Sequence, residues 1–561
     1  MEYDKNVKDT QVDTNSTPSE SADAVITEFP PSTGHIYGSV EPHVFSHPAR
    51  AEYWRNVYDN AKYECRHRFD PSFQWSPLGE VTVKRKLDWR IMLWVWIMFS
   101  SLDLVRRNIN RAVSDNMLDD IDVNTNDYNT GQTIYLVSFL AAELPGGLIS
   151  KKVGPFRYTP AVIVLWGSLC MTQAAIKARW SFWLLRALLG VAQGGFIPEM
   201  VWDLYIPPAL AIANNYGQIL YLSYFYKGNE LAVRLSIFYT AIPLTQIYGS
   251  LLAAGLLEMR GVLGWGGWQW LFLIEGLICV LIGIAAFFVM PPSITEPALA
   301  FKRPDGTNKW WTEEEEKILV NRLLRDDPTK GDLNNRTAVT LRGIWQTLSN
   351  FDLWPIFIVG IFAWIPFQPT SNYLSLILRG MGYTVFQSNL LAIPGYALFA
   401  INVVVFGQIS SRLNERFLVA ACSNLWMLPF FCALVALKPD TNPWIRYAML
   451  TGINGIPYTH SILVGMVSQN AKAVGRRAVA AAIYNMTYQV GSIAAVNIYR
   501  EGDKPYYYTA NKGLIGLCVV NIVLFVLAKL YYVWRNRVLA RQYVDLSETD
   551  KARFFDARFV H

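Results

Sequence analysis

Charged residues are scarce in this chain. Only 17% of its 561 residues are Asp, Glu, Lys or Arg, against roughly 25% in an average soluble domain, whereas 52% are hydrophobic. The charges gather in the first 90 residues, between 301 and 342, and in the C-terminal tail. The apolar runs between them are long enough to cross a bilayer core of ~30 Å, which takes about 20 helical residues. This pattern excludes a soluble fold and predicts a membrane protein.

Cysteine and histidine are also rare, at six residues each. Five of the six cysteines lie in apolar segments without metal-like spacing, so we expect packing residues and no disulfide framework. The sequence has no phosphate-binding Gly-Lys-Ser/Thr loop, no His-Glu-x-x-His zinc helix and no Ser/His/Asp set in a soluble domain. We therefore expect neither an enzyme nor a cofactor or metal ion, and no use of ATP.

The net charge of +6 does not indicate nucleic acid, because the positive residues stand at the ends of apolar runs. The first 45 residues are polar and rich in Ser, Thr, Pro and Asp, with no cleavable signal peptide. We predict that residues 1–86 form a cytosolic, mostly disordered N-terminal tail. The first membrane helix then acts as the targeting signal.

Twelve apolar segments are candidate membrane helices. They lie at 89–109, 130–149, 159–176, 181–198, 235–256, 269–290, 354–373, 386–409, 417–437, 444–467, 478–498 and 513–534. Clusters of Lys and Arg follow the even-numbered segments, which by the positive-inside rule places both termini in the cytosol. The fold class predicted is an all-α membrane protein with twelve transmembrane helices in two six-helix bundles.

The bundles span 87–292 and 354–537, and the polar stretch 293–353 between them is predicted to be a cytosolic linker. Thr312 precedes four glutamates, which predicts an N-cap and an amphipathic helix through Arg325. Residues 538–561 are predicted to be a cytosolic C-terminal tail.

Two motifs resemble signatures of the major facilitator superfamily. After the second span the chain reads Gly147-Leu-Ile-Ser-Lys151-Lys152-Val-Gly154-Pro-Phe-Arg157, similar to a loop in which glycines allow a tight turn and basic residues latch the two halves. The acidic residue usual in that loop is replaced. In the fourth span, Arg186-Ala-Leu-Leu-Gly190-Val-Ala-Gln-Gly194-Gly195 resembles an intramembrane arginine above a stripe of small residues. The resemblance implies two halves related by a pseudo-two-fold axis and gating or structural roles for these residues.

A closer resemblance is to the fungal allantoate permease group of anion:cation symporters, from about Leu87 to Arg537. The motifs that carry it are Asp103-Leu-Val-Arg-Arg107-Asn108-Ile109-Asn110, Ala142-Glu143-Leu-Pro145, Gly194-Gly195-Phe-Ile-Pro198-Glu199-Met200, Leu220-Tyr-Leu-Ser-Tyr-Phe-Tyr226, Trp270-Leu-Phe-Leu-Ile-Glu275-Gly276 and Arg322-Leu-Leu-Arg325-Asp326-Asp327-Pro328. It implies proton-driven uptake of a small carboxylate such as allantoate, nicotinate, pantothenate or biotin. In this group the acid of the first span stands three residues before the Asn-Ile pair, whereas Asp103 stands five before it.

Residues 201–218 form an anomalous insert relative to this group. The segment contains Pro207-Pro208, and paired prolines break helices. One interpretation is a retained intron translated in frame, because Val codons begin GT, Gln can be CAG, and Ala213-Asn214 can encode a branch-site sequence. The other is a genuine cytosolic loop.

Three titratable residues inside spans are candidates for proton coupling, because a charge at the bilayer centre costs about 2.5–3.5 kcal/mol on insertion scales and needs a reason. They are Glu143, Asp103 and His460. Alternatively, Glu143 is a structural partner at the gate, His460 is a hydrogen-bonded core residue, and Asp103 is solvated at the outer mouth with Arg106 and Arg107.

Polar residues in the spans are candidates for substrate binding. Arg186 can grip a carboxylate bidentately, although a role in latching helices is equally open. The other candidates are Gln368, Asn372, Tyr373, Asn454, Tyr458, Tyr484, Asn485, Tyr488 and Gln489. Alternatively, these residues form hydrogen bonds that hold neighbouring helices together. For Glu275 we favour a structural role.

The sequence therefore predicts a secondary active transporter in the plasma membrane, a monomer whose partners are a small carboxylate, protons and the lipid bilayer. Two alternatives stay open. One is a metabolite exporter driven by proton antiport, and the other is a nutrient receptor that does not transport.

Overall fold

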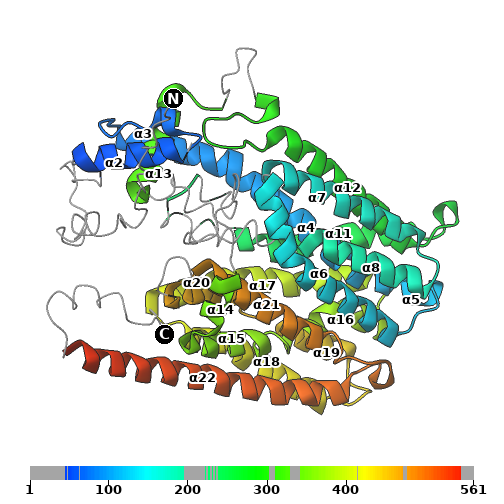
Figure 1. Cartoon of the computed structure of the whole chain (residues 1–561). Helices are drawn as coiled ribbons and strands as arrows, with labels where there is room; N and C mark the ends of the chain where they lie inside the picture. The colour runs from blue at the N-terminus through cyan, green and yellow to red at the C-terminus, as the bar shows by residue number, and fades with distance from the viewer. Residues whose placement is uncertain are drawn as a thin grey trace, which may run out of the picture. The chain divides into compact units, whose positions relative to one another are not determined.

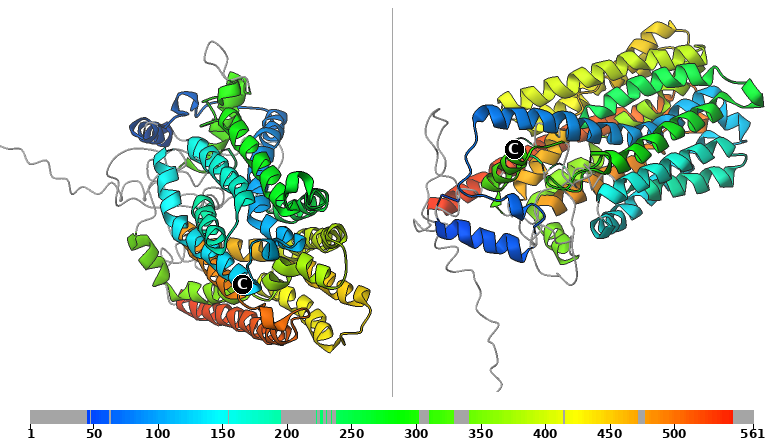
Figure 2. Two further views of the ribbon diagram at one scale, coloured as in Figure 1. Left: turned by 90° about the vertical axis from the view of Figure 1, so that its right-hand side faces the viewer. Right: turned by 90° about the horizontal axis from the view of Figure 1, so that it is seen from above.

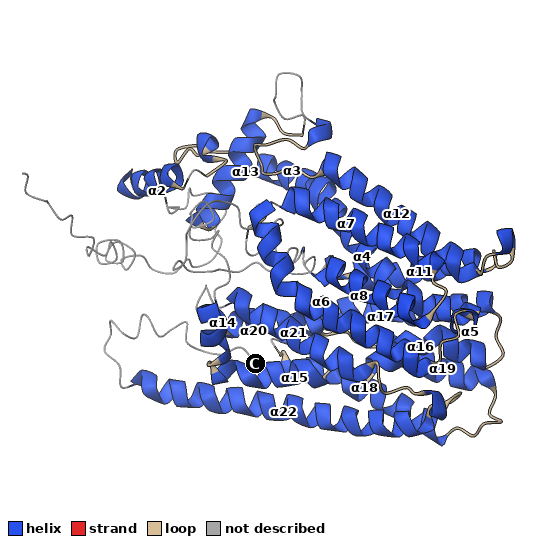
Figure 3. Cartoon of the chain, turned by 45° about the vertical axis from the view of Figure 1, so that its right-hand side comes forward, coloured by secondary structure: helices blue, strands red, loops and turns tan. Residues whose placement is uncertain are grey.

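The computed structural model describes residues 45–544 except 47, 62, 154, 195–221, 223–224, 228–229, 231–233, 235–237, 302–309, 329–340, 414 and 472–476. Within this part of the chain every regular element is a helix and none is a strand (Figure 3). The anomalous insert 201–218, Gly154 and the tails 1–44 and 545–561 lie outside the described residues.

The N-terminal half contains six long helices that lie side by side (Figure 1). They are α4 (Leu93–Ala112), α6 (Thr125–Val153), α7 (Pro155–Thr172), α8 (Arg179–Gly194), α11 (Ala241–Leu257) and α12 (Gly267–Val289). A short π-helical turn, Asp88–Met92, leads into α4. Each helix overlaps one predicted span.

The C-terminal half is built from helices that overlap the other six predicted spans. They are α15 (Trp354–Phe362), α16 (Phe367–Gly380), α17 (Val385–Leu413), α18 (Phe417–Ala436), α19 (Pro443–Asn454), α20 (His460–Asn470), α21 (Arg477–Ala495) and α22 (Tyr508–Val544). Two spans are broken, between α15 and α16 and between α19 and α20. Pro366 and Pro457 stand at these breaks, where a proline cannot donate the helical hydrogen bond.

Five of the described helical segments are long and apolar enough to cross a membrane. They are Gly267–Val289, Phe351–Gly380, Val385–Ser410, Phe417–Ala436 and Tyr508–Arg541, and Ala241–Leu257 is a shorter apolar helix. The helix α4 is more polar, since it carries Asp103, Arg106, Arg107 and Arg111. Twelve crossings therefore stay a prediction, although each predicted span overlaps a described helix.

The bundle has two ends, which we name by their neighbours. At the linker end lie α2 (Pro48–Asn60), α3 (Pro77–Leu87), α13 (Glu313–Asp326) and α14 (Leu341–Leu348) (Figures 1 and 2). The far end carries the loops that join α4 to α6, α11 to α12 and α21 to α22. Thr312 caps α13 with Glu315 in a capping box, as predicted.

The N-terminal tail is more ordered than predicted. Arg68 Nε donates to Glu316 Oε2 of α13 over 2.9 Å, and the Asp70 N–H donates to Asn321 over 2.8 Å. Tyr58 and Phe69 are buried against each other with their rings 5.0 Å apart. The first two contacts link segments some 250 positions apart. Together the three contacts correct the expectation of disorder for residues 48–61 and 63–86.

Glycines allow two helices of the N-terminal half to touch along their backbones. A Cβ atom on Gly190 would lie 2.4 Å from Tyr135 O, and one on Gly194 would lie 2.4 Å from Phe139 O. The helices α6 and α8 therefore approach more closely than side chains permit. Between the halves, α11 packs against α17 and α6 against α21.

Candidate functional site

A small polar cavity lies between the halves, where α4 and α6 face α16 and α21. Its volume is about 60 Å³, room for a few water molecules. The polar residues that line it are Arg106, Arg107, Asn110, Gln132, Tyr135, Gln368, Ser371, Asn372 and Tyr488. A larger solute can enter only if the halves move apart.

Two arginines of α4 line this cavity. Arg107 Nε donates to Asp103 Oδ1 over 2.8 Å, one turn away on the same helix. Arg106 reaches across to the C-terminal half, where its Nη2 lies 3.4 Å from Gln489 Oε1. Its guanidinium carbon also lies 5.3 Å from the centre of the Phe139 ring, within cation–π range.

A third arginine lies just behind the cavity. Arg186 of α8 is fully buried, donates to Gln132 Oε1 and lies over the Tyr135 ring at 4.4 Å. Its Nε and Nη1 have no hydrogen-bond partner among the described residues. Buried guanidinium donors without partners are costly.

Two carboxylates accompany the three arginines. Asp103 is buried, and its Oδ2 has no hydrogen-bond partner among the described residues. Glu143 of α6 is also buried, its Oε2 likewise lacks a partner there, and Arg106 is the charge that acts on it. The three arginines and two carboxyl groups therefore carry a net positive charge together.

Hydrogen bonds fix the polar residues of α4 and α6. Tyr128 Oη donates to Asn110 Oδ1 over 2.9 Å, and Gln132 Nε2 donates to Tyr128 Oη over 2.8 Å. This orients the Gln132 carbonyl toward Arg186. Asn110 Nδ2 also lies 3.3 Å from Asn372 Oδ1 of α16, so the network crosses between the halves.

The C-terminal half brings four predicted binding residues to the cavity or its edge. Gln368, Asn372 and Tyr488 line the cavity, and Gln489 contacts Arg106. Gln368 Nε2 donates to Ser492 Oγ over 2.6 Å. Tyr373 lies beyond the cavity, where its hydroxyl donates to Asn129 of α6.

The predicted residue His460 lies in an aromatic cluster behind Tyr488. Its ring centre is 5.1 Å from that of Tyr488, 5.4 Å from Tyr484 and 5.6 Å from Tyr458. Asn485 is also its neighbour. These predicted residues are brought together, but His460, Tyr458, Tyr484 and Asn485 do not line the cavity.

Other predicted residues lie elsewhere. Asn454 is buried between α17 and α19, where its Cβ is 3.1 Å from the position of a Cβ on Gly395, and its Nδ2 bonds back to Leu450 O. Glu275 is fully buried inside the N-terminal half near Asn108 and Arg111.

The basic motif after the second span begins within a helix, because α6 continues to Val153. Gly147, Lys151 and Lys152 therefore belong to α6 rather than to a loop, and Arg157 is exposed on α7. The helix continues through this run although Pro145 lies inside the helix, two residues before Gly147.

The structure corrects one alternative for the first span. Asp103 is only 3% exposed and Arg107 is half-buried, so Asp103 is not solvated at an outer mouth. Sequence reasoning also missed Asn110, Gln132 and Tyr135. Each of them stands four residues after another residue on the same helix: Asn110 after Arg106, Gln132 after Tyr128 and Tyr135 after Gly131. Residues four apart share one helix face, and this spacing could have indicated them.

Hydrogen bonds between the halves close the far end. The Thr125 N–H donates to Glu501 Oε2 over 3.0 Å, and Asn129 Nδ2 donates to Tyr499 O over 2.7 Å. Asn497 Nδ2 donates to Thr133 Oγ1 over 2.9 Å. The cavity is therefore separated from the far end in this conformation.

Known proteins are similar to this chain in sequence and in fold. Residues 217–496 match the Major Facilitator Superfamily. An uncharacterized transporter of Saccharomyces cerevisiae is 49% identical over 535 residues, covering 93% of this chain and 95% of the yeast protein. The chain belongs to the Major Facilitator Superfamily.

Other relatives are more distant in sequence. An uncharacterized transporter of Schizosaccharomyces pombe is 26% identical, covering 81% of this chain and 83% of that protein. A protein of Agrobacterium vitis with a proposed role in tartrate transport is 30% identical, covering 61% of this chain and 71% of its own.

Solved structures share the superfamily fold. The nucleoside transporter NupG has a TM-score of 0.54 at 11% identity, over 78% of this chain and 99% of that one. A bacterial homologue of the lysosomal transporter Spinster, inward-facing and unoccupied, has a TM-score of 0.53 at 13% identity, over 81% and 96%. The chain is thus a multi-pass membrane transporter of the superfamily, with a small-molecule substrate, rather than an enzyme.

Proposed function

We propose that this transporter is a proton-coupled symporter that takes up a small organic anion. The observation that carries the proposal is the net positive cluster of Arg106, Arg107 and Arg186 at a cavity between the halves. Transporters of this fold place their substrates at such a midplane interface. An arginine stays charged in any environment, so the cluster favours an anion at every pH.

The anion is a carboxylate in this proposal. Arg186 has two donor nitrogens, Nε and Nη1, without partners among the described residues, and charge-assisted hydrogen bonds from a guanidinium to a carboxylate are strong. Gln368, Asn372, Tyr488 and Gln489 supply amide and hydroxyl groups from the opposite half. The proposed role of the Agrobacterium vitis relative, tartrate transport, is also that of an organic anion carrier.

Asp103 is the proposed site of proton coupling. Its carboxylate competes with substrate for Arg107, because the two form an ion pair of 2.8 Å at the cavity wall. Protonation of Asp103 would free the Arg107 guanidinium for the substrate carboxylate. Proton and anion would then each strengthen binding of the other, which is positive coupling. Glu143, next to Arg106, is the second candidate for this role.

Several finer features belong to the proposal. By the resemblance of its motifs we place the protein with the allantoate permease group, with allantoate, nicotinate, pantothenate or biotin as candidate substrates. We also propose that the protein is a monomer in the plasma membrane. The charge pattern of the sequence supports both termini in the cytosol. The far-end contacts of Thr125, Asn129 and Thr133 would break when the site turns outward.

The test is uptake of labelled allantoate, nicotinate, pantothenate, biotin and ureidosuccinate into transporter-deficient fungal cells at acidic and neutral pH. The full chain is compared with one lacking residues 201–218, and surface expression is measured for both. We expect acid-stimulated uptake of one compound that an uncoupler abolishes. Uptake of none of them, or outward movement of a preloaded compound, would contradict the proposal.

A further inference from the structure

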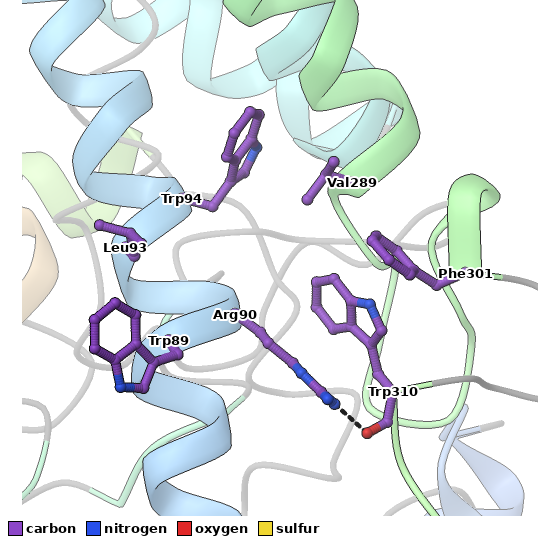
Figure 4. A pocket seen from close by; sticks show the side chains of 7 residues that line it. All are labelled: Trp89, Arg90, Leu93, Trp94, Val289, Phe301 and Trp310. Atoms are coloured by element: carbon purple, nitrogen blue, oxygen red, sulfur yellow. Dashed lines mark hydrogen bonds between the residues drawn. The ribbon is translucent and has the colours of Figure 1, made fainter.

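A second cavity lies at the linker end, outside the helix interface that holds the candidate site. Its volume is about 410 Å³, and it lies between the start of α4 and the end of α12 (Figure 4). Trp89, Leu93, Trp94 and Val289 supply its apolar part. Trp89 is 67% exposed and Leu93 is 41% exposed, so the cavity opens on the outer surface of the bundle.

The polar part of this cavity is one arginine among aromatic rings. Arg90 points away from α4 toward Trp310, whose carbonyl oxygen accepts a hydrogen bond from its Nη1 (Figure 4). Its guanidinium carbon is also 5.6 Å from the centre of the Trp310 ring and 5.3 Å from that of Trp311. The Arg90–Trp310 bond uses one donor atom of a group that has five N–H donors.

The apolar and polar parts of the cavity follow each other along the bundle as the acyl chains and the headgroup do in a lipid molecule. Trp94 and Val289 lie toward the helices, and Arg90 lies toward the linker segment (Figure 4). Tryptophans gather where hydrocarbon meets headgroups.

Charge selects the class of lipid. The last turn of α3, immediately before this site, carries Lys84, Arg85 and Lys86. Lys84 is paired with Glu230 and Lys86 with Glu315, so the charges that attract a lipid here are those of the exposed Arg85 and of Arg90. Basic side chains at a membrane surface attract anionic lipids, at about 1 kcal/mol for each residue near the surface. With the orientation predicted from the sequence, the linker end faces the cytosolic leaflet, where anionic lipids are found.

We propose that this cavity binds one anionic phospholipid, with its phosphate at Arg90 and an acyl chain along Leu93, Trp94 and Val289. The lipid fills the space between α4, α12 and the linker segment that contains Trp310. It thereby ties the first and sixth predicted spans to the linker on the outer surface of the bundle.

The test uses the purified full chain in detergent, titrated with phosphatidylserine or with phosphatidylcholine of the same acyl chains. Thermal unfolding and native mass spectrometry are the readouts. We expect phosphatidylserine to raise Tm by several degrees and to stay bound as a one-to-one adduct, while phosphatidylcholine does neither. Glycerophosphoserine, which has the headgroup without acyl chains, separates a lipid site from a free phosphate site.

Two variants test whether Arg90 and Leu93 are needed for lipid binding. Arg90→Gln should abolish the phosphatidylserine shift, while Arg412→Gln, an exposed arginine near the end of α17, should keep it. Leu93→Glu places a negative charge at the opening and leaves the Arg90–Trp310 bond intact. Its control is Leu244→Glu, because Leu244 is equally exposed at 41% near the linker end of α11.

The outcomes are distinct. Loss of the lipid shift in Arg90→Gln and Leu93→Glu, with both controls responding like the wild type, supports the proposal. An unchanged phosphatidylserine response in both site variants overturns it. So does a full response to glycerophosphoserine or to phosphatidylcholine, since the site would then not require an anionic headgroup joined to acyl chains.

Discussion

Arg107 and Asp103 form an ion pair one helical turn apart on α4, with Nε 2.8 Å from Oδ1. The pair stands at the wall of the cavity between the halves, and Asp103 Oδ2 remains buried without a partner among the described residues. A carboxylate in this position can hold the arginine or release it when protonated. The ion pair therefore connects the two proposed ligands, the proton and the anion.

Asp103→Asn removes the titratable group and keeps the side-chain shape. We expect uptake driven by a pH gradient to fall at least tenfold, while exchange of labelled for unlabelled substrate at equal pH persists. Asp440→Asn, on an exposed loop at the far end, should change neither. Acid-stimulated uptake by Asp103→Asn would assign the proton to Glu143 instead.

Arg106→Gln removes one positive charge from the cavity and the contact with Gln489. We expect the KM for the anion to rise about tenfold, equivalent to about 1.4 kcal/mol of binding, and Arg106→Lys to recover part of the loss. The exposed Arg379 provides the control in Arg379→Gln. An unchanged KM in Arg106→Gln would remove this arginine from the substrate site.

Gly190→Ala tests the backbone contact between α6 and α8. The added methyl group would meet Tyr135 O at 2.4 Å, and such overpacking costs about 1–3 kcal/mol. Gly255→Ala in α11 meets nothing within 4 Å and should gain roughly 0.5–1 kcal/mol from helix propensity. Thermal unfolding in detergent should lower Tm for the first and raise it slightly for the second, and equal Tm values would refute the close approach.

Glu501 makes the far-end contact pH-dependent. Burial alone would raise the pKa of its carboxyl, but hydrogen bonds from Thr125 and Lys504 outweigh burial and lower the pKa. A group with a lowered folded pKa stabilises the fold above its unfolded pKa, about 4.3 for glutamate. That contribution is lost as the pH falls through the folded value.

The comparison is Tm against pH for the wild type and Glu501→Gln. We expect the wild type to be more stable near pH 6. The difference should begin to shrink below the ordinary glutamate pKa of about 4.3 and vanish only below the lowered folded pKa. Glu258→Gln, exposed at the same end, should follow the wild type. A constant difference at all pH values would mean that ionisation of Glu501 does not matter.

The sequence predicted the helices better than the site. Each of the twelve predicted spans overlaps a described helix, because long apolar runs are local signals, as is the Thr312 cap. A proline marks each break, Pro366 in one span and Pro457 in the other. The division of each of these spans into two helices was not predicted. The superfamily was also recognisable from short motifs such as Arg186 to Gly194.

The site depended on contacts that no local pattern contains. Whether Arg106 and Arg107 face solvent or the interior is decided by how α4 packs against α6 and α16, and the alternative of a solvated Asp103 was wrong. The bond from Arg186 to Gln132 joins positions 54 residues apart. Likewise, the ordered part of the N-terminal tail depends on α13, which lies some 250 positions away.

The last helix, α22, has 37 residues. At about 1.5 Å per residue it is about 55 Å long, nearly twice the ~30 Å of a bilayer core. Tyr531 and Arg535 tie it to Asp352, beside the start of α15. A fluorophore attached near the C-terminal end of α22 would therefore move rigidly with the C-terminal half. Its distance to a second dye on α13 would report the motion of the two halves relative to each other during turnover.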